Sequence, residues 1–130
     1  MKHHETRLSR SAEDYLECIG HICRENGVAR VNDIAQRLHV KKPSVTVAVR
    51  RLAELGYVSY QQYSPIELTP RGHQYANRVI QAHSILRRFM KEVAGLSSER
   101  ANETACLIEH ILTPEEIHKL SERLPARGDI

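Results

Sequence analysis

Two short runs of the sequence carry side chains that commonly bind metal ions. The first run contains Asp14 and Glu17, and the second contains Cys106, Glu109 and His110. Residues three or four positions apart lie on one face of an α-helix, one turn above another. If both runs are helical, each of them gathers its ligands on one side. The spacing therefore predicts a divalent-metal site built from carboxylate, thiolate and imidazole groups.

An imidazole from a third segment joins this set, so that the candidate ligands are Asp14, Glu17, His83, Cys106, Glu109 and His110. Carboxylates suit hard ions such as Mn²⁺, imidazole suits most transition ions, and a thiolate shifts the preference toward Fe²⁺, Co²⁺ or Zn²⁺. Adjacent residues point about 100° apart on a helix, so a bridging carboxylate at Glu109 or a second ion is an open alternative. Taken singly, each ligand has an ordinary explanation; for example, Asp14 and Glu17 also complement a helix dipole. Their joint occurrence favours the metal site.

Helices are expected to carry all of these ligands. Caps, apolar periodicity and stop signals predict ligand-bearing helices over residues 9–25, 70–93 and 98–112, followed by a last helix that reaches residue 124. Ser9 or Ser11 is the cap of the first of these helices. The sequence therefore predicts a mainly α protein in which three helices bring the ligands together.

The intervening segment has the pattern of a winged helix-turn-helix. A short extended piece and a helix capped by Asn32 precede a turn, and a second helix begins at Pro43, where the missing N–H costs nothing. Strand-like residues and a connecting loop follow, which is typical of a β-hairpin wing. The expected elements are an extended segment at 28–31, helices at 33–38 and 43–55, and strands at 57–60 and 66–68.

In this motif the second helix enters the DNA major groove, and a dimer reads a symmetric site. Because the apolar stripe of the 43–55 helix is expected to be buried, the opposite face of this helix is exposed. On that face, lysines suit DNA phosphates, and an arginine can read a guanine edge. The alternative is a surface helix with ordinary solvated charges, or a plain hairpin in place of a DNA-binding wing. The predicted DNA-binding residues are Lys41, Lys42, Ser44, Thr46, Val47, Arg50, Arg51 and Gln62.

The composition sets limits on these interpretations. The 130 residues carry 19 Lys and Arg against 16 Asp and Glu, for a net charge of +3, so DNA binding rests on where the charges lie. Residues 1–10 have no apolar core of a signal peptide, and no stretch approaches the ~18 apolar residues of a membrane span. We therefore expect a cytoplasmic protein with no membrane partner. Cys18 and Cys23 alternate with apolar residues and are expected to pack in the core.

The residues quoted so far match a known family. Through its segments 11–17, 29–35, 43–46 and 108–110, the chain resembles the diphtheria-toxin-repressor family, and within it the short manganese-transport-regulator branch. The resemblance implies a homodimeric winged-helix repressor with a DNA-binding domain at 1–72 and a helical dimerisation and metal-binding domain at 73–130. It also leads us to expect no SH3-like domain of the longer members, because the chain stops at Ile130.

The resemblance carries the ligand positions over residue by residue, with one departure. Asp14, Glu17, His83, Glu109 and His110 match the manganese branch. That branch usually has a glutamate at the position of Cys106, whereas the iron-responsive branch has a cysteine there but a methionine at the position of Asp14. Arg87 stands where the iron branch places an acidic ancillary ligand. The resemblance implies Mn(II) or Fe(II), and the thiolate of Cys106 leaves Zn(II) or Co(II) as alternatives.

These expectations combine into a metal-dependent repressor of metal-ion uptake genes that binds a palindromic operator as a homodimer. Two alternatives stay open. One is a metal-independent winged-helix regulator that senses a small ligand or, through Cys106, the redox state. The other is a metalloenzyme with an open coordination position, but no general base or substrate pocket can be identified beside the ligands. We therefore predict a regulator rather than an enzyme.

Overall fold

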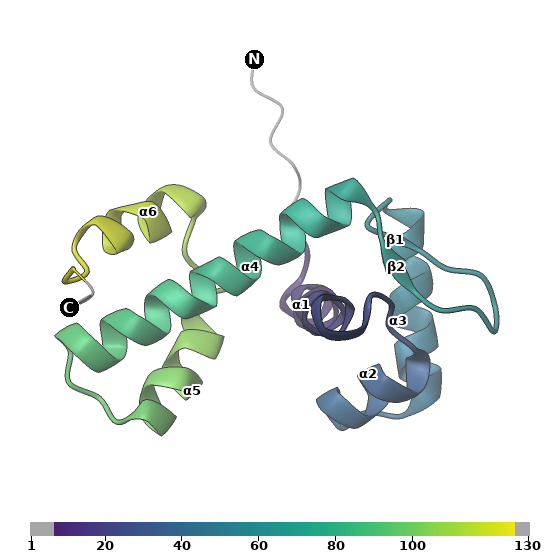
Figure 1. Cartoon of the computed structure of the whole chain (residues 1–130), viewed down its shortest axis with the longest axis horizontal. Coiled ribbons are helices and arrows are strands. Elements are labelled where there is room, and N and C mark those ends of the chain that lie inside the picture. The colour runs from purple at the N-terminus through teal and green to yellow at the C-terminus, as the bar shows by residue number, and fades with distance from the viewer. Residues whose placement is uncertain (1–6, 127–130) are drawn as a thin grey trace, which may run out of the picture. The chain divides into compact units, whose positions relative to one another are not determined.

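The computed structural model describes residues 7–126 and separates into two compact units, one up to Asn77 and one from Arg78 onward. The first six residues of the expected 1–72 domain and the last four of the expected 73–130 domain lie outside the described residues. The expected boundary falls within the first turn of helix α4 (Pro70–Arg88), which contributes to both units. The mainly α architecture is confirmed (Figure 1).

Helix α1 (Arg10–Asn26) is the central element of the first unit. Of the two possible caps, Ser9 is the one used: its hydroxyl accepts a hydrogen bond from the Ala12 N–H at 3.1 Å. Gly27 ends the helix at φ +85°, a conformation that favours glycine, and donates its N–H to Cys23 O at 2.7 Å. Between these two ends, α1 buries an apolar stripe that includes Leu16 and Ile19. The first predicted helix is thus confirmed.

Helices α2 (Val31–Leu38) and α3 (Lys42–Glu54) form the helix-turn-helix, joined through His39 in the left-handed conformation. The predicted Asn32 cap is wrong, because α2 begins at Val31 and its N-cap, Arg30, makes no side-chain capping bond. Extended backbone at Arg30 already lets its carbonyl accept the Ile34 N–H at 3.1 Å, so Asn32 lies inside the first turn. Helix α3 begins at Lys42, one residue before Pro43. Pro43 is therefore the second residue of the helix, where a missing N–H still costs no helical hydrogen bond.

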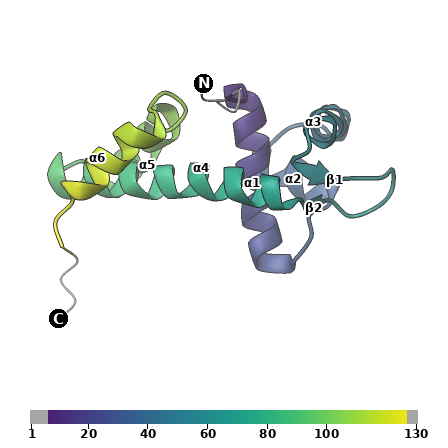
Figure 2. The same ribbon diagram turned by 90° about the horizontal axis from the view of Figure 1, so that it is seen from above.

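Strands β1 (Val58–Ser59) and β2 (Glu67–Leu68) pair antiparallel, with Val58 opposite Leu68. The hairpin is present as predicted, but its strands are shorter than expected. A separate bridge pairs Ala29 with Ile66 through bonds of 2.9 and 2.7 Å, which ties the predicted extended segment to the hairpin. The loop between the strands projects beyond them (Figure 2). These features complete a winged helix-turn-helix.

The core of the first unit joins all of these elements. Apolar side chains of α1, α2 and α3 meet under the hairpin, and Tyr57 lies edge-on to Tyr75 at a ring-centroid distance of 5.3 Å. Thr69 caps α4, since its hydroxyl accepts the Gly72 N–H at 3.0 Å. Fully buried members of this core are Leu16, Ile19, Ile34, Val45, Val49, Leu52, Tyr57 and Ile66.

The second unit contains the C-terminal half of α4, a π-helical turn η1 (Phe89–Val93), α5 (Ser98–Ile108) and α6 (Pro114–Glu122). Helices α5 and α6 both pack against α4 (Figure 1), through a cluster of Ala82, Leu86, Ala105 and Ile117. None of the helices within residues 7–126 combines the length and apolar character needed to cross a bilayer.

Two predicted helix ends in this unit are wrong. Helix α5 stops at Ile108 rather than Leu112, and α6 stops at Glu122 rather than Leu124. After Ile108 the backbone tightens, with the N–H of Ile111 donating to Ile108 O at 2.8 Å. The chain must then leave the helix because Thr113 adopts the extended backbone of a capping box for α6.

Candidate metal centre and DNA-facing surface

Three of the six predicted ligands meet in the second unit. The ligand atoms of His83, Cys106 and Glu109 all lie within 4.8 Å of one another. His83 Nδ1 is 2.6 Å from Glu109 Oε1 and 3.7 Å from Cys106 Sγ. Ligands bonded to one transition ion at ~2.0–2.3 Å are separated by distances of this order. The nitrogen, sulfur and oxygen donors therefore fit a single divalent ion.

Two packed helices position these donors. His83 lies on α4, Cys106 lies in the last turn of α5, and Glu109 is the C-cap residue of α5. The small buried residues Ala82 and Ala105 belong to the cluster that packs α4 and α5 together. Because each of them is next in sequence to a ligand, the core packing directly sets the separation between the imidazole and the thiol.

Glu109 is the buried acid of the site. Only 3% of this residue is exposed, and an uncompensated buried carboxylate is costly. Its Oε1 contacts His83, and its Oε2 lies 3.5 Å from His110 Nε2. The hydrogen bond with Glu109 raises the pKa of His83, although burial of the ring acts in the opposite direction. The centre thus favours positive charge beside Glu109, whether on an imidazolium or on a metal ion.

His110 lies outside the helix that was predicted to carry it. Since α5 ends at Ile108, His110 occupies the following turn, and its side chain is nearly buried. The turn brings its ring to the side of Glu109 that His83 does not use. A carboxylate placed between two imidazoles in this way is arranged to bind one ion or to bridge two.

The remaining candidate ligands belong to the first unit. Asp14 and Glu17 are half-buried on α1, one turn apart. Glu17 Oε2 lies 3.8 Å from Nε2 of His21, four residues further along the same helix.

Sequence reasoning missed two polar residues that the structure makes conspicuous. Asn102 Oδ1 lies 2.8 Å from His83 Nε2; its position four residues before Cys106, on the same helical face, was the available signal. Glu13 is buried, with its carboxylate hydrogen-bonded to Tyr75 and 3.3 Å from Arg7 Nε. A charged residue one turn before Leu16, on the apolar face of α1, was the signal in that case.

The outer face of α3 carries the predicted DNA-binding residues. Val45 and Val49 are fully buried, whereas Lys41, Lys42 and Val47 on the other side are exposed. Ser44, Arg50, Arg51 and, in the wing loop, Gln62 are exposed as well. Thr46 is half-buried and donates its hydroxyl to Lys42 O at 3.2 Å. This face leaves the cationic groups available to phosphates or base edges.

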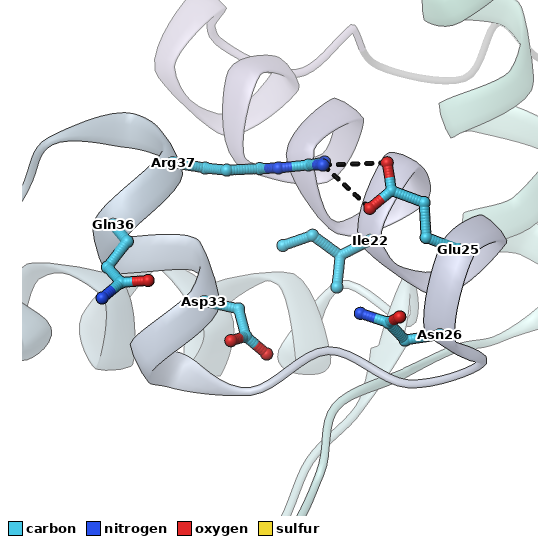
Figure 3. A pocket seen from close by; sticks show the side chains of 6 residues that line it. All are labelled: Ile22, Glu25, Asn26, Asp33, Gln36 and Arg37. Atoms are coloured by element: carbon cyan, nitrogen blue, oxygen red, sulfur yellow. Dashed lines mark hydrogen bonds and ion pairs between the residues drawn. The ribbon is translucent and has the colours of Figure 1, made fainter.

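A depression of about 270 Å³ lies elsewhere on the first unit, between α1 and α2. In Figure 3, Arg37 reaches across it to both oxygens of Glu25, each at 2.8 Å. The other lining residues are Ile22, Asn26, Asp33 and Gln36, and none of the predicted site residues is among them. We therefore attribute this depression to the packing of α1 against α2.

The cysteines differ in burial, and this difference separates Cys106 from Cys18 and Cys23. Cys18 is buried, and burial raises the pKa of its thiol to about 11. Cys23 is half-buried, and burial again raises its thiol pKa. Both are therefore poor thiolates at neutral pH. Cys106 is exposed and lies beside His83, so it is the cysteine suited to metal binding.

Comparison with known proteins places these features in a family. Residues 7–66 match the N-terminal DNA-binding domain of iron-dependent repressors, and residues 69–126 match their metal-binding and dimerisation domain. An uncharacterised HTH-type transcriptional regulator of Methanocaldococcus jannaschii is 36% identical over 114 residues, which cover 87% of this chain and 91% of the relative. The HTH-type transcriptional regulator MntR of Lysinibacillus sphaericus is 36% identical over 112 residues, covering 86% and 80%.

Among solved structures, IdeR of T. acidophilum is similar with a TM-score of 0.75 and 31% identity. The match covers 92% of this chain but only 55% of IdeR, so the chain spans about half the length of that structure. The matched domains account for both the winged helix-turn-helix and the helical unit that holds His83, Cys106 and Glu109. The chain belongs to the iron-dependent repressor family of metal-dependent, dimeric DNA-binding transcriptional regulators, which are not enzymes.

Proposed function

We propose that this chain represses metal-ion uptake genes by binding a palindromic operator as a homodimer when its metal ion is present. The observation that carries the proposal is the convergence of His83, Cys106 and Glu109 within the matched metal-binding and dimerisation domain. The exposed cationic face of α3 supplies the DNA-binding half. Since its target is genomic DNA, the protein acts in the cytoplasm.

The proposed ligand set adds Asp14, Glu17 and His110 to the three converging residues. Three carboxylates and two imidazoles suit Mn(II) or Fe(II), and the Cys106 thiolate adds affinity for Fe(II), Zn(II) or Co(II). Glu109 presents one oxygen to each of two histidines. This arrangement supports a bridging role if two ions bind.

The coupling between metal and DNA follows from the charges. Without an ion, Asp14, Glu17 and Glu109 repel one another, and α1 is held loosely against the dimerisation domain. A bound cation supplies the positive charge that offsets this repulsion. The ligands then fix the spacing of the two DNA-binding domains in the dimer. Metal and DNA affinities are therefore coupled reciprocally, typically by ~1–3 kcal/mol.

In the operator contact, α3 lies in the major groove. Lys41 and Lys42 bind phosphates near its N-terminus, whereas Arg50 is placed on the exposed face to read a base edge. Ser44 and Thr46 add short hydrogen-bonding groups, and Val47 offers an apolar contact to a thymine methyl group. The set is completed by Arg51 on α3 and Gln62 in the wing.

Operator titration with Mn²⁺, Fe²⁺, Zn²⁺ or a chelator tests the proposal. We expect Glu109→Ala to lower operator affinity only when metal is present, because the carboxylate acts through the ion. Arg50→Ala is the matched comparison and should lower affinity by about 1–3 kcal/mol in both conditions, since its target is DNA. Equal operator affinity with every ion and with the chelator would reject metal control.

The exposure of Cys106 beside His83 favours one competing function. In that case the regulator is metal-independent, and oxidation of the thiol controls DNA binding. A chelator would then have no effect on the titration, while a mild oxidant would change operator affinity in the wild type and not in Cys106→Ser.

A further inference from the structure

We infer that Asn102 is a positioning residue of the metal centre, which holds the His83 ring so that Nδ1 is the nitrogen that binds the ion. The inference rests on the proposed metal-binding function and deepens it. Asn102 is not among the ligands proposed above; it acts on the ion only through His83.

Both nitrogens of His83 are engaged, and they face opposite surroundings. Nδ1 lies 2.6 Å from Glu109 Oε1 and 3.7 Å from Cys106 Sγ, which are the other donors of the centre. Nε2 lies 2.8 Å from the amide oxygen Oδ1 of Asn102. An amide oxygen only accepts hydrogen bonds, so Nε2 must carry the hydrogen. When Nδ1 gives up its own proton, its lone pair is the one available to a cation, beside the carboxylate and the thiol.

Helix α5 supplies every one of these contacts. Asn102, Cys106 and Glu109 lie on successive turns of one helical face, and all three approach the single ring that α4 provides. A rotation of the ring by half a turn about the Cβ–Cγ bond would put Cδ2 in place of Nδ1 beside Glu109 and Cys106, and Cε1 in place of Nε2 beside the amide. The hydrogen bond at Asn102 opposes that rotation.

The surroundings of Asn102 indicate that it contributes little to the stability of the fold. Asn102 is exposed, and its side chain is not part of the Ala82–Leu86–Ala105–Ile117 core. Water can replace its amide in supporting the fold, since exposed hydrogen bonds contribute little net stability. Histidine ligands commonly donate their second ring N–H to such a partner, and loss of the partner typically weakens metal binding by ~10–100-fold.

Metal titration of the full chain provides the first test, with Zn²⁺ and Mn²⁺ as probes in competition with a chromophoric chelator. We expect Asn102→Leu to bind both ions about 10–100-fold more weakly while its melting temperature stays close to that of the wild type. Asn102→Asp keeps the acceptor oxygen and should retain wild-type affinity. Asn77→Leu is the matched control: Asn77 is an exposed asparagine that accepts a hydrogen bond from Arg24 at 3.0 Å, and its replacement should leave metal affinity unchanged.

The second test is spectroscopic and needs only the wild-type chain. In the Zn²⁺-loaded protein, ¹⁵N shifts of His83 should identify Nδ1 as the metal-bound nitrogen and Nε2 as the protonated one. Metal on Nε2, or equal affinities for wild type and Asn102→Leu, would overturn the role of Asn102 while leaving the metal site intact. A wild-type chain that binds neither ion would instead overturn the proposed function on which this inference rests.

Discussion

At the scale of single residues, the chemistry of this protein centres on the Glu109 carboxylate. A buried carboxylate needs positive or hydrogen-bonding partners, and Glu109 has an imidazole near each of its oxygens. In the metal-free protein, the hydrogen bond with Glu109 raises the pKa of His83 and so favours a positive charge on its ring. A metal ion takes over that role, so the same residues serve two states of the protein.

This exchange makes the stability of the metal-free protein depend on pH. The pKa of His83 is raised above its ordinary value of 6.5 by the hydrogen bond with Glu109. A raised pKa in the folded state contributes stability that is complete below the unfolded value and is lost as pH rises through the folded value. We therefore expect the free energy of unfolding to fall as pH rises above about 6.5 and through the raised pKa of His83.

Urea denaturation in the presence of a chelator at several pH values measures this effect. His83→Gln should flatten the pH profile, because the titrating group is gone. Arg100→Gln breaks an exposed ion pair in the same unit and serves as the control, since arginine does not change its charge in this range. An unchanged profile in His83→Gln would exclude His83 as the source.

Cys106 determines which ions the centre prefers. Thiolates favour Zn²⁺ and Co²⁺ over Mn²⁺, whereas carboxylates favour Mn²⁺. We predict that Cys106→Ser weakens Zn²⁺ and Co²⁺ binding by at least tenfold and changes Mn²⁺ binding much less. Chelator competition measures the three affinities, and the thiolate-to-cobalt absorption band should disappear. A uniform loss for all three ions would mean that the thiol acts through the fold rather than as a ligand.

At the scale of helices and strands, the first turn of α4 fits closely against the backbone just before β1. A Cβ atom added at Gly72 would lie 1.9 Å from the carbonyl oxygen of Tyr57 and 3.2 Å from Leu68 Cδ2. The nearest atom is backbone and cannot move aside cheaply. We expect Gly72→Ala to cost about 2 kcal/mol or more through overpacking.

Chemical denaturation followed by circular dichroism checks this value. Gln74→Ala, at an exposed position of the same helix, should change stability by less than ~0.5 kcal/mol. A Gly72→Ala protein as stable as the wild type would show that the hairpin and α4 can separate without penalty.

Local signals predicted most elements but not all of their ends. The Ser9 and Thr69 caps and the Gly27 stop act within one turn of chain, so their residue types alone identify them. The end of α5 was wrong because apolar periodicity continues past Ile108, while the competing capping box at Thr113 decides where the helix must stop. The predicted start of α2 was wrong because the Arg30 carbonyl accepts the first helical hydrogen bond, from the Ile34 N–H, without a side-chain cap.

In the metal centre, too, the sequence predicted what lies within one helix but not the contacts between two helices. Spacing within one helix predicted that Cys106 and Glu109 share a face, and the imidazole of His83 joined them as a candidate from a third segment. The orientation of the His83 ring depends on Asn102, which comes from a different helix. Contacts of this kind depend on how two helices pack, and the periodicity of either helix does not contain them.

At the scale of the whole molecule, the dimerisation domain exposes two large apolar side chains next to the ligands. Leu107 and Ile111 are 52% and 72% exposed and lie four residues apart. Their neighbours Cys106 and His110 face the metal centre. Because this domain belongs to a dimeric family, we predict that Leu107 and Ile111 lie in the self-association interface, which would connect the ligand segment directly to the partner subunit.

Sedimentation velocity over a range of protein concentrations tests this interface. The double substitution Leu107→Glu and Ile111→Glu should raise the dimer dissociation constant at least tenfold, which corresponds to ~1.4 kcal/mol. Val47→Glu places a charge at an equally apolar and exposed position of α3 and should lower operator affinity without changing dimerisation. Unaltered dimers of the double variant would place the interface elsewhere.

The wing loop carries a cost that the fold itself does not require. Tyr63 has a left-handed backbone at φ +65°, and 92% of the residue is exposed. This conformation disfavours a bulky residue by roughly 1–2 kcal/mol, whereas glycine or asparagine adopts it readily. A thermostabilised version of this protein would replace that tyrosine first, and in doing so would remove the largest aromatic surface that the hairpin can offer to a nucleic acid. Robustness to heat and quality of recognition are therefore opposed at this one loop.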